Sequence, residues 1–379
     1  MKRIFIKASF AILVAGAISS CGKNELVHPN GQENVGPGKP STDTTIVVVP
    51  PSDKSYIDLS NFTNMPKPGV SYAAAGADGK VIFAGGSYKI ASISSEAFIY
   101  DINTKEWTTS SIHSGYGVSS AAGSGDKILF AGGSASSLVD IYDTKKGTWT
   151  TTNLSDSRYK MAATSLRNFV VFAGGGKAGN TNSTAVDIYN VLNNTWTTGN
   201  LSAGRRSLVA AGAGNKVLIA GGYNDAVDVS DIVDIYDVLT NTWSVKRLSM
   251  PRDHMAAVGA GNQVFFAGGM FEGKSVDRVD IYDVSTGLWS KSTLSTARSD
   301  IAAAAVGNYI VFAGGNNAGV PSNVVDMYNV VTKKWSTTQL IESRTSVAAA
   351  TVGDNILFGG GELTSSYSKV VEIFTLRKP

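Results

Sequence analysis

The chain contains only one cysteine, Cys21, and three histidines among its 379 residues. A single cysteine excludes disulfide bonds within the chain, and so few sulfur and imidazole ligands argue against a zinc site. Charged residues are also scarce, at 17% of the sequence, and the formal net charge is only +3. This small net charge gives no electrostatic reason to expect nucleic-acid binding.

Long apolar runs are missing after the N-terminal segment, so no later stretch is predicted to span a membrane. Glycine, in contrast, is frequent, with 41 residues. Abundant glycine together with little charge favours a β-rich globular protein over a disordered chain or a coiled coil.

Residues 1–20 have the pattern of a secretory signal peptide, which is not part of the fold. A basic start is followed by an apolar run, and small residues then lead to Cys21 and Gly22. This end resembles the cleavage box of bacterial lipoproteins, and the resemblance implies that Cys21 becomes the first mature residue and carries the lipid. The alternative is an ordinary signal peptide in which the cysteine stands by chance.

An acyl anchor at Cys21 would hold the protein on a membrane without crossing it. Residues 21–54, which begin with this cysteine, are rich in Pro, Gly, Thr and Asn, and this composition indicates a flexible tether. Gly22 differs from the Asp that resembles an inner-membrane retention signal in enteric bacteria, so we expect the outer membrane. Both its periplasmic and its outer face are compatible with the sequence.

One unit occurs seven times between residue 55 and the C-terminus. In each copy a short apolar run ends in a pair of glycines, the first of which are Gly85, Gly132, Gly174, Gly221, Gly268, Gly314 and Gly360. An aromatic residue follows, at Tyr100, Tyr142, Tyr189, Tyr236, Tyr282, Tyr328 and Phe374. In the first six copies a Trp stands seven residues after this aromatic, and these are all six tryptophans of the protein.

Each unit predicts four strands, of which the first is rich in alanine and the second is continuously apolar. Small side chains are needed where many strands crowd a common axis, so the alanine-rich strand should be innermost. The sequence therefore predicts an all-β, seven-bladed β-propeller over residues 55–379. The last unit ends after its third strand, and we expect Tyr56–Phe62 to supply the missing outer strand and close the ring.

The pattern of Gly-Gly, then Tyr, then Trp, with Arg before the next unit, resembles the Kelch repeat over about residues 55–379. WD40 repeats share the period, but their Gly-His and Trp-Asp signatures are absent. The resemblance implies a propeller but not one activity. The Kelch family includes protein-interaction scaffolds, galactose oxidase and a bacterial sialic acid mutarotase.

A basic position recurs nine residues after the Trp, and it is occupied by Arg158, Arg205, Arg252, Arg298 and Arg344, with Tyr116 in the first copy. Five arginines around a channel mouth would bind a carboxylate or a phosphate. The alternative is structural, because an Asp lies eighteen residues before each of these arginines. Each arginine would then clamp its blade to the Asp of the preceding blade.

Residues that break the repeat are better candidates for a binding site than residues that maintain it. Variable loops follow the glycine pairs, and binding residues concentrate on such loops. The candidates near the arginine position and on these loops are Tyr159, Lys160, Arg206, His254, Asp300, Tyr223, Phe271, Glu272 and Glu362. Together they predict a polar, partly cationic pocket with aromatic walls for an acidic sugar or an acidic peptide. The alternative is a solvated loop face.

Galactose oxidase chemistry is excluded, because that family needs two His and a Cys crosslinked to Tyr, whereas the only Cys here is Cys21. A mutarotase or epimerase needs only an acid–base pair and an anion-holding arginine. His254 or Glu272 could act with Arg252, Arg298 and Arg344. The mutarotases of the family look six-bladed, however, and seven units are counted here.

The leading prediction is a lipid-anchored, monomeric, non-catalytic module that binds a glycan or a protein through its loop face. It needs no cofactor and no metal, and it meets the membrane only through its anchor. The second prediction is a sugar-processing enzyme that resembles a sialic acid mutarotase or epimerase and acts on an acidic sugar.

Overall fold

The computed structural model describes residues 55–89, 92–113, 120–133, 136–224 and 228–378. The predicted signal peptide, Cys21 and the tether lie outside these residues, and so does Tyr116. The chain separates into Met1–Pro51 and Ser52–Pro379, and only the second unit is described here. In the described part of the chain, no helix is long and apolar enough to cross a bilayer.

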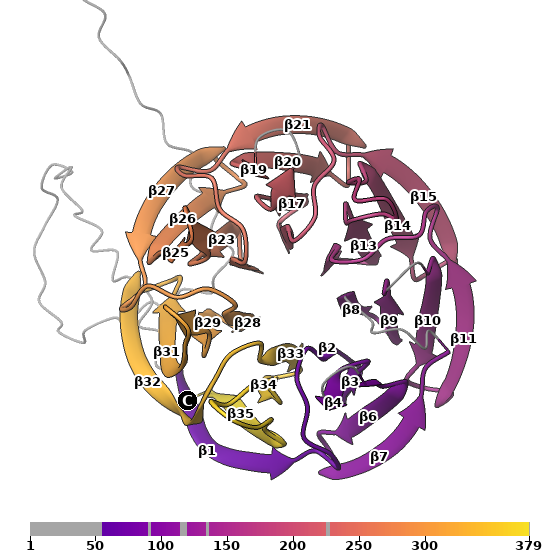
Figure 1. Ribbon diagram of the computed structural model, residues 1–379, viewed down its shortest axis with the longest axis vertical. Helices are drawn as coiled ribbons and strands as arrows, with labels where there is room; N and C mark the ends of the chain where they lie inside the picture. Colours follow the sequence, from indigo (N-terminus) through magenta and orange to yellow (C-terminus); the bar gives the residue numbers. More distant parts are fainter. Residues whose placement is uncertain (1–54, 90–91, 114–119, 134–135, 225–227, 379) are drawn as a thin grey trace, which may run out of the picture. The chain divides into compact units, whose positions relative to one another are not determined.

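Seven antiparallel sheets stand around an open centre like the blades of a propeller (Figure 1). The innermost strands are β2 (Ala73–Ala77), β8 (Ser120–Ser124), β12 (Ala162–Leu166), β16 (Val209–Ala213), β22 (Ala256–Ala260), β28 (Ala302–Val306) and β33 (Ala348–Val352). Each innermost strand contacts the next, and β33 contacts β2, so the ring is closed. The fold is thus the predicted all-β, seven-bladed propeller.

The second strands are β3 (Lys80–Ala84), β9 (Lys127–Ala131), β13 (Phe169–Ala173), β17 (Lys216–Ala220), β23 (Gln263–Ala267), β29 (Tyr309–Ala313) and β34 (Asn355–Gly359). The third strands are β6 (Glu96–Asp101), β10 (Leu138–Asp143), β14 (Ala185–Asn190), β20 (Ile232–Asp237), β26 (Arg278–Asp283), β31 (Val320–Asn329) and β35 (Val370–Arg377). The outermost strands are β7 (Glu106–Ser111), β11 (Thr148–Asn153), β15 (Thr195–Asn200), β21 (Thr242–Arg247), β27 (Leu288–Thr293), β32 (Lys334–Arg344) and β1 (Tyr56–Asn64).

Short strands lie in the loops between the second and third strands. They are β4 (Ser87–Lys89), β5 (Ser92–Ile93), β18 (Tyr223–Asn224), β19 (Asp228–Val229), β24 (Met270–Phe271), β25 (Lys274–Ser275) and β30 (Asn316–Asn317). Except for β30, which pairs with β31, they form two-stranded hairpins. These hairpins were not predicted, because the loop sequences do not share the repeat pattern.

Crowding at the axis explains the small residues of the innermost strands. A Cβ atom added at Gly259 would lie 2.0 Å from the carbonyl oxygen of Gly212 on the neighbouring innermost strand. The same contact recurs between Gly123 and Gly76, at 2.3 Å. Even the Cβ atom of an alanine would push adjacent blades apart at Gly123 and Gly259, so glycine is required at these two positions.

Tyr and Trp fill the space where the blades diverge. Tyr142 on β10 lies opposite Trp149 on β11, and their ring centroids are 4.9 Å apart. The indole nitrogen of Trp149 donates a hydrogen bond of 3.0 Å to Ser110 on the outermost strand of the preceding blade. Trp149 therefore joins consecutive blades as well as packing within its own, and Trp335 does the same through Ser292.

The N-terminal strand closes the ring, as predicted. β1 pairs antiparallel with β35, from Tyr56 opposite Arg377 to Asn64 opposite Val370. Trp107 of the first blade donates a hydrogen bond of 3.1 Å to Thr63 on β1. The seventh blade is thus completed by the other end of the same domain (Figure 1).

The five repeated arginines are internal, and the partner predicted for them is wrong. Nη1 of Arg158 donates to the carbonyl oxygens of Gly174 and Ala185, at 2.9 and 2.6 Å, and Nη2 pairs with Asp187. Asp187 lies on the blade that Arg158 enters, not on the preceding blade. The remaining pairs follow the same rule: Arg205 with Asp234, Arg252 with Asp280, Arg298 with Asp326, and Arg344 with Glu372.

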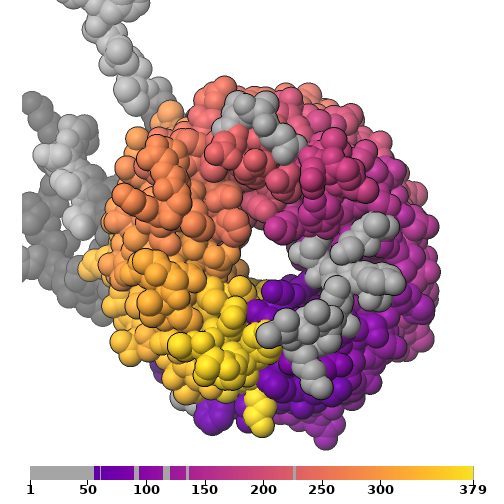
Figure 2. Space-filling view, in the orientation of Figure 1, coloured from indigo at the N-terminus to yellow at the C-terminus, as the bar shows by residue number. Residues whose placement is uncertain are grey.

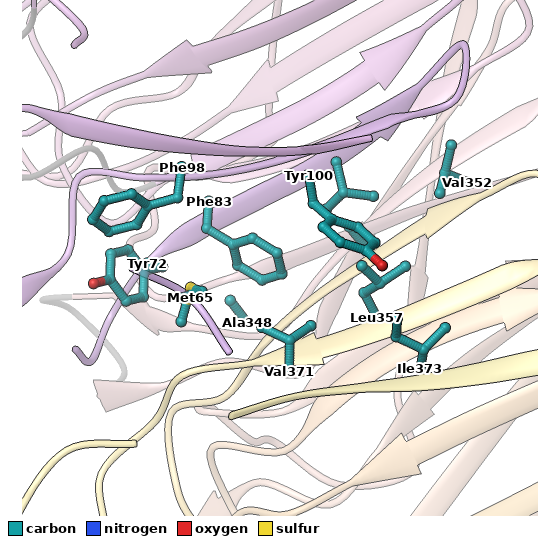
Figure 3. Close-up of a cluster of buried hydrophobic side chains, with 12 residues drawn as sticks. Met65, Tyr72, Phe83, Phe98, Tyr100, Ala348, Val352, Leu357, Val371 and Ile373 are labelled. Carbon is teal, nitrogen blue, oxygen red and sulfur yellow. The ribbon is translucent and has the colours of Figure 1, made fainter. Parts of the chain in front are cut away.

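The first blade replaces this ion pair by an apolar cluster (Figure 3). Gly69 stands at the arginine position and Phe98 at the acid position. The ring of Tyr72 packs on Phe98 edge to face, with centroids 6.1 Å apart. A Cβ atom at Gly69 would lie 2.3 Å from the Tyr72 hydroxyl oxygen, so the aromatic ring fills the space that an arginine would need.

Candidate functional site

The link into each blade and the loop after each glycine pair lie on one face of the ring, called here the loop face. Single antiparallel bridges join them at Val70 and Ser87, Tyr159 and Gly176, Arg206 and Tyr223, Asp253 and Met270, Ser299 and Asn316, and Thr345 and Glu362. The off-pattern residues of the link and of the loops are therefore neighbours, as the alternating strand directions predict.

Lys160, His254 and Asp300 occupy equivalent positions in three blades, and each has a left-handed backbone with φ of 52°, 49° and 51°. Serine takes the same conformation at Ser71, Ser207 and Ser346. The amide of Asp300 donates to the carbonyl oxygen of His254, at 3.0 Å, so consecutive blades are joined at this level. The scaffold fixes this backbone, while the side chain varies from blade to blade.

His254 is paired with its neighbour Asp253. Nδ1 of His254 lies 3.1 Å from Oδ2 of Asp253, and the imidazole side chain is 40% exposed. The hydrogen bond to Asp253 raises the pKa of His254 above 6.5, burial opposes the shift, and Asp300 supports it while Lys160 opposes it. Met161 and Ile301, the residues that follow Lys160 and Asp300, line the central cavity, so these positions lie at the end of the channel on the loop face.

Arg206 and Tyr223 form a second feature of this face. The guanidinium of Arg206 lies 4.3 Å from the centroid of the Tyr223 ring, a cation–π contact. Nη1 of Arg206 also donates to Oδ1 of Asn182, at 3.0 Å. Both side chains are half-buried, so they present a flat, cationic and partly apolar surface.

Phe271 and Glu272 lie on the hairpin of β24 and β25, which the bridge from Asp253 to Met270 holds beside the Asp253–His254 pair. Phe271 is half-buried, and Glu272 is exposed at the turn with φ of 48°. The structure thus brings the hairpin close to His254. Glu362 is bridged to Thr345 two blades further round the ring.

The five arginines do not reach the loop face, because each side chain is fully buried. Their Nη groups donate hydrogen bonds to carbonyl oxygens and to the acid of the same blade. In the described residues their Nε atoms have no hydrogen-bond partner. These groups hold the second and third strands together in five of the blades, whereas Lys160 and His254 are exposed and Arg206 is half-buried.

A cavity of about 270 Å³ lies in the channel below the mouth, lined by Ser120, Met161, Leu208, Ile301 and alanines of the innermost strands. A second cavity of about 310 Å³ continues along the axis between alanine and glycine residues. Figure 2 shows the open centre of the ring. A ligand at the mouth would thus meet charged groups around it and small apolar groups beneath it.

Sequence reasoning missed Asp253. The sequence does mark this residue, because an acid at this position breaks the pattern of the repeat. Other blades hold Val70, Tyr159, Arg206, Ser299 and Thr345 there. In the described part of the chain, no group of three or more His, Cys, Asp or Glu residues is placed to hold a metal ion.

Comparisons with known proteins agree with this fold. The family model described as the KLHDC2/KLHL20/DRC7 Kelch-repeats domain matches residues 207–377. Among similar solved structures is that of YjhT, which is 15% identical and superposes with a TM-score of 0.55 over 83% of this chain and 99% of that chain. No curated protein matches the sequence. At this identity the structural likeness concerns the fold alone.

Proposed function

We propose that this seven-bladed propeller of Kelch repeats is a binding module that is anchored by lipid in the cell envelope. The fold by itself defines no single activity. Its loop face holds a glycan or a protein ligand at the mouth of the central channel. The ligand carries an acidic group, which Lys160 and the protonated form of His254 contact.

The observation that carries this proposal is the separation of roles among the charged residues. The repeated arginines are buried in the frame, whereas Lys160 and Arg206 occur once each and lie at the mouth or on the loop face. Tyr223 beside Arg206 and Phe271 on the hairpin beside Asp253 add flat apolar surface, and aromatic faces of this kind stack on sugar rings and on peptide groups. The face therefore suits an acidic sugar or an acidic peptide.

A sugar-processing enzyme is the second candidate, and the Asp253–His254 pair favours it. A carboxylate at 3.1 Å from Nδ1 fixes the orientation of the imidazole and leaves Nε2 to exchange a proton with a substrate. The raised pKa keeps more of the imidazole protonated near neutral pH, which suits a general acid. In this case Asp253 would be a positioning residue and His254 the acid or base.

A calorimetric screen of the full chain tests both candidates. The panel contains glucuronate-ended oligosaccharides, their neutral counterparts, a hexaglutamate peptide and a hexalysine peptide. We expect saturable binding of an acidic member and none of the hexalysine peptide; failure of every acidic member would contradict the proposal. Proton NMR of the bound sugar separates the candidates, because an enzyme would interconvert its anomers or epimers and His254→Gln would abolish that conversion.

The lipid anchor is tested by labelling cells with an alkyne fatty acid. We expect wild-type protein to take up the label and to fractionate with membranes, and Cys21→Ser to lose both properties. A Cys21→Ser protein that still carries the label would contradict the lipid at this position.

A further inference from the structure

The seam where the ring closes contains a cavity that is separate from the loop face. It lies between β1 and β35 of the seventh blade and the first blade, with a volume of about 260 Å³. Its lining includes Phe62, Tyr100, Ile102, Lys105, Ile373 and Arg377. The two strands of the seventh blade come from opposite ends of the domain and meet here (Figure 1).

The repeat is broken at this seam. The other six outermost strands carry the Trp that packs on the Tyr of the third strand, but the seventh blade has Phe374 and no Trp. The pairing of β1 with β35 is irregular between Asp58 and Asn61, so two residues of β1 stand opposite Phe374 alone. A bulge of this kind re-aims the side chains beside it. Phe62 follows the bulge by two residues and is 61% exposed.

The walls of the cavity combine apolar surface with a few polar groups. Tyr100 and Ile373 are buried, with 3% and 6% exposure, and they form an apolar floor. Thr375 donates a hydrogen bond of 2.8 Å to Asn355 on the cavity wall. An exposed aromatic ring above a buried apolar floor leaves a gap into which a flat ring could insert.

The charge at the rim is positive. Lys105 is exposed on the turn after β6 and forms no ion pair with any residue that the structure describes. Arg377 lies at the other side and shares its guanidinium with Asp58, at 3.0 Å. Lys105 and Arg377 are the charged residues of the lining, and Asp58 pairs with Arg377, so a carboxylate would complement Lys105.

We propose that this seam binds a small carboxylic acid that carries one aromatic ring system, monocyclic or fused. The ring lies between Phe62 and the floor of Tyr100 and Ile373, and the carboxylate meets Lys105 and Arg377. The volume of about 260 Å³ is below that of pockets for drug-sized ligands, which limits the occupant to one ring system. Because such a ligand touches β1, β35 and the first blade together, its binding would also stabilise the closed ring.

Calorimetry and thermal unfolding of the full chain test this site, with phenylacetate and indole-3-acetate as probes and phenylacetamide as the neutral match. We expect saturable binding of at least one acid, about tenfold weaker binding of the amide, and a melting temperature that rises with acid concentration. Absence of saturable binding by both acids, or equal affinity for the amide, would overturn the proposal.

Variants locate the binding. Phe62→Ala and Lys105→Ala should each lower the affinity for the acid by roughly tenfold. The control is Lys146→Ala, which changes an exposed lysine on the equivalent turn of the second blade and should leave the affinity unchanged. Phe62 and Lys105 are both exposed, so neither change should alter the melting temperature without ligand by more than about 2 °C. If Phe62→Ala lowers the melting temperature, only the affinity of Lys105→Ala for the acid tests the site. Affinity that is unchanged in Lys105→Ala would contradict the site.

Discussion

At the scale of single residues, the buried arginines stabilise the fold. Each one donates hydrogen bonds to two backbone carbonyl oxygens and also pairs with a buried acid. Arg298 donates from Nη1 to the carbonyl oxygens of Gly314 and Val324, at 2.6 and 2.7 Å, and it pairs with the buried Asp326. Burial lowers the pKa of Arg298, while the charge of Asp326 opposes that change. Removing the guanidinium would leave both the carboxylate and the carbonyl groups without their cation.

Arg298→Ala should therefore lower the free energy of unfolding by about 3–5 kcal/mol, because a buried acid is left uncompensated. Urea unfolding monitored by tryptophan fluorescence measures the change. The matched control is Arg247→Ala, whose ion pair with Asp231 has an arginine that is 68% exposed, and about 0–1 kcal/mol is expected there. Equal effects of the two changes would contradict the structural role.

The partner of these arginines could not be chosen from the sequence. An Asp lies 18 residues before Arg205 and another lies 29 residues after it, and the two are one repeat of 47 residues apart. Both acids have the same phase, so spacing alone does not distinguish the blade behind from the blade ahead. The structure decides, because the link crosses toward the axis of the next blade and carries the arginine over that blade's third strand.

His254 provides a pH-dependent signal at the candidate site. Its pKa is raised by the hydrogen bond to Asp253, so the protonated form is favoured in the folded protein. The stabilisation that this pair contributes is fully present below the unfolded pKa of about 6.5 and is lost as the pH rises through the folded pKa. The binding of an acidic ligand should weaken over the same range.

An NMR titration of the His254 ring measures this shift. We expect a midpoint above that of an unstructured histidine, and a lower midpoint in Asp253→Asn, because the largest cause of the shift is removed. Ser346→Ala, at the equivalent left-handed position of the seventh blade, should leave the midpoint in place. A midpoint that Asp253→Asn does not move would show that another group controls the imidazole.

At the scale of the elements, β1 determines whether the propeller is closed. It provides the only outer strand that pairs with β35 among the described residues. Ile57 and Leu59 pack on the core shared by the sixth and seventh blades, and Thr63 accepts the hydrogen bond of Trp107. Loss of β1 would expose one edge of β35 and remove the acceptor of Trp107.

Deletion of residues 55–64 should lower the melting temperature by more than about 5 °C, because apolar packing on both neighbouring blades is lost. Circular dichroism on heating measures the effect. Deletion of residues 30–39, an equal length of the predicted tether, is the control and should leave the melting temperature unchanged. An unaltered transition after loss of residues 55–64 would contradict closure by this strand.

The strands of the repeat could be predicted from the sequence, whereas the short loop strands could not. The prediction of four strands in each unit, with the alanine-rich strand first, is confirmed, and β22 is an example of that first strand. These strands could be predicted because the same sequence pattern occurs in seven copies of the unit. The hairpin of β24 and β25 has no equivalent pattern in the other copies, and its residues therefore gave no periodic signal.

At the scale of the whole molecule, repetition separates the frame from the site. All seven blades contribute to the alanine-lined channel, six carry the Tyr–Trp pair, and five carry the buried arginine. The charged residues at the channel mouth occur in single copies, so the ring is symmetric in its frame and asymmetric on its loop face. The chemistry of the ligand could be predicted only as a class, because single copies carry no repeated pattern.

The most direct test of this account compares binding and stability in two variants of the full chain. Calorimetry with a glucuronate-ended oligosaccharide and with a hexaglutamate peptide is run on Lys160→Ala and on the control Ser346→Ala. We expect that at least one probe binds, that Lys160→Ala lowers its affinity by roughly tenfold at unchanged stability, and that Ser346→Ala has no effect. Binding that is equal in both variants, or absent with both probes, would contradict a ligand site at the channel mouth.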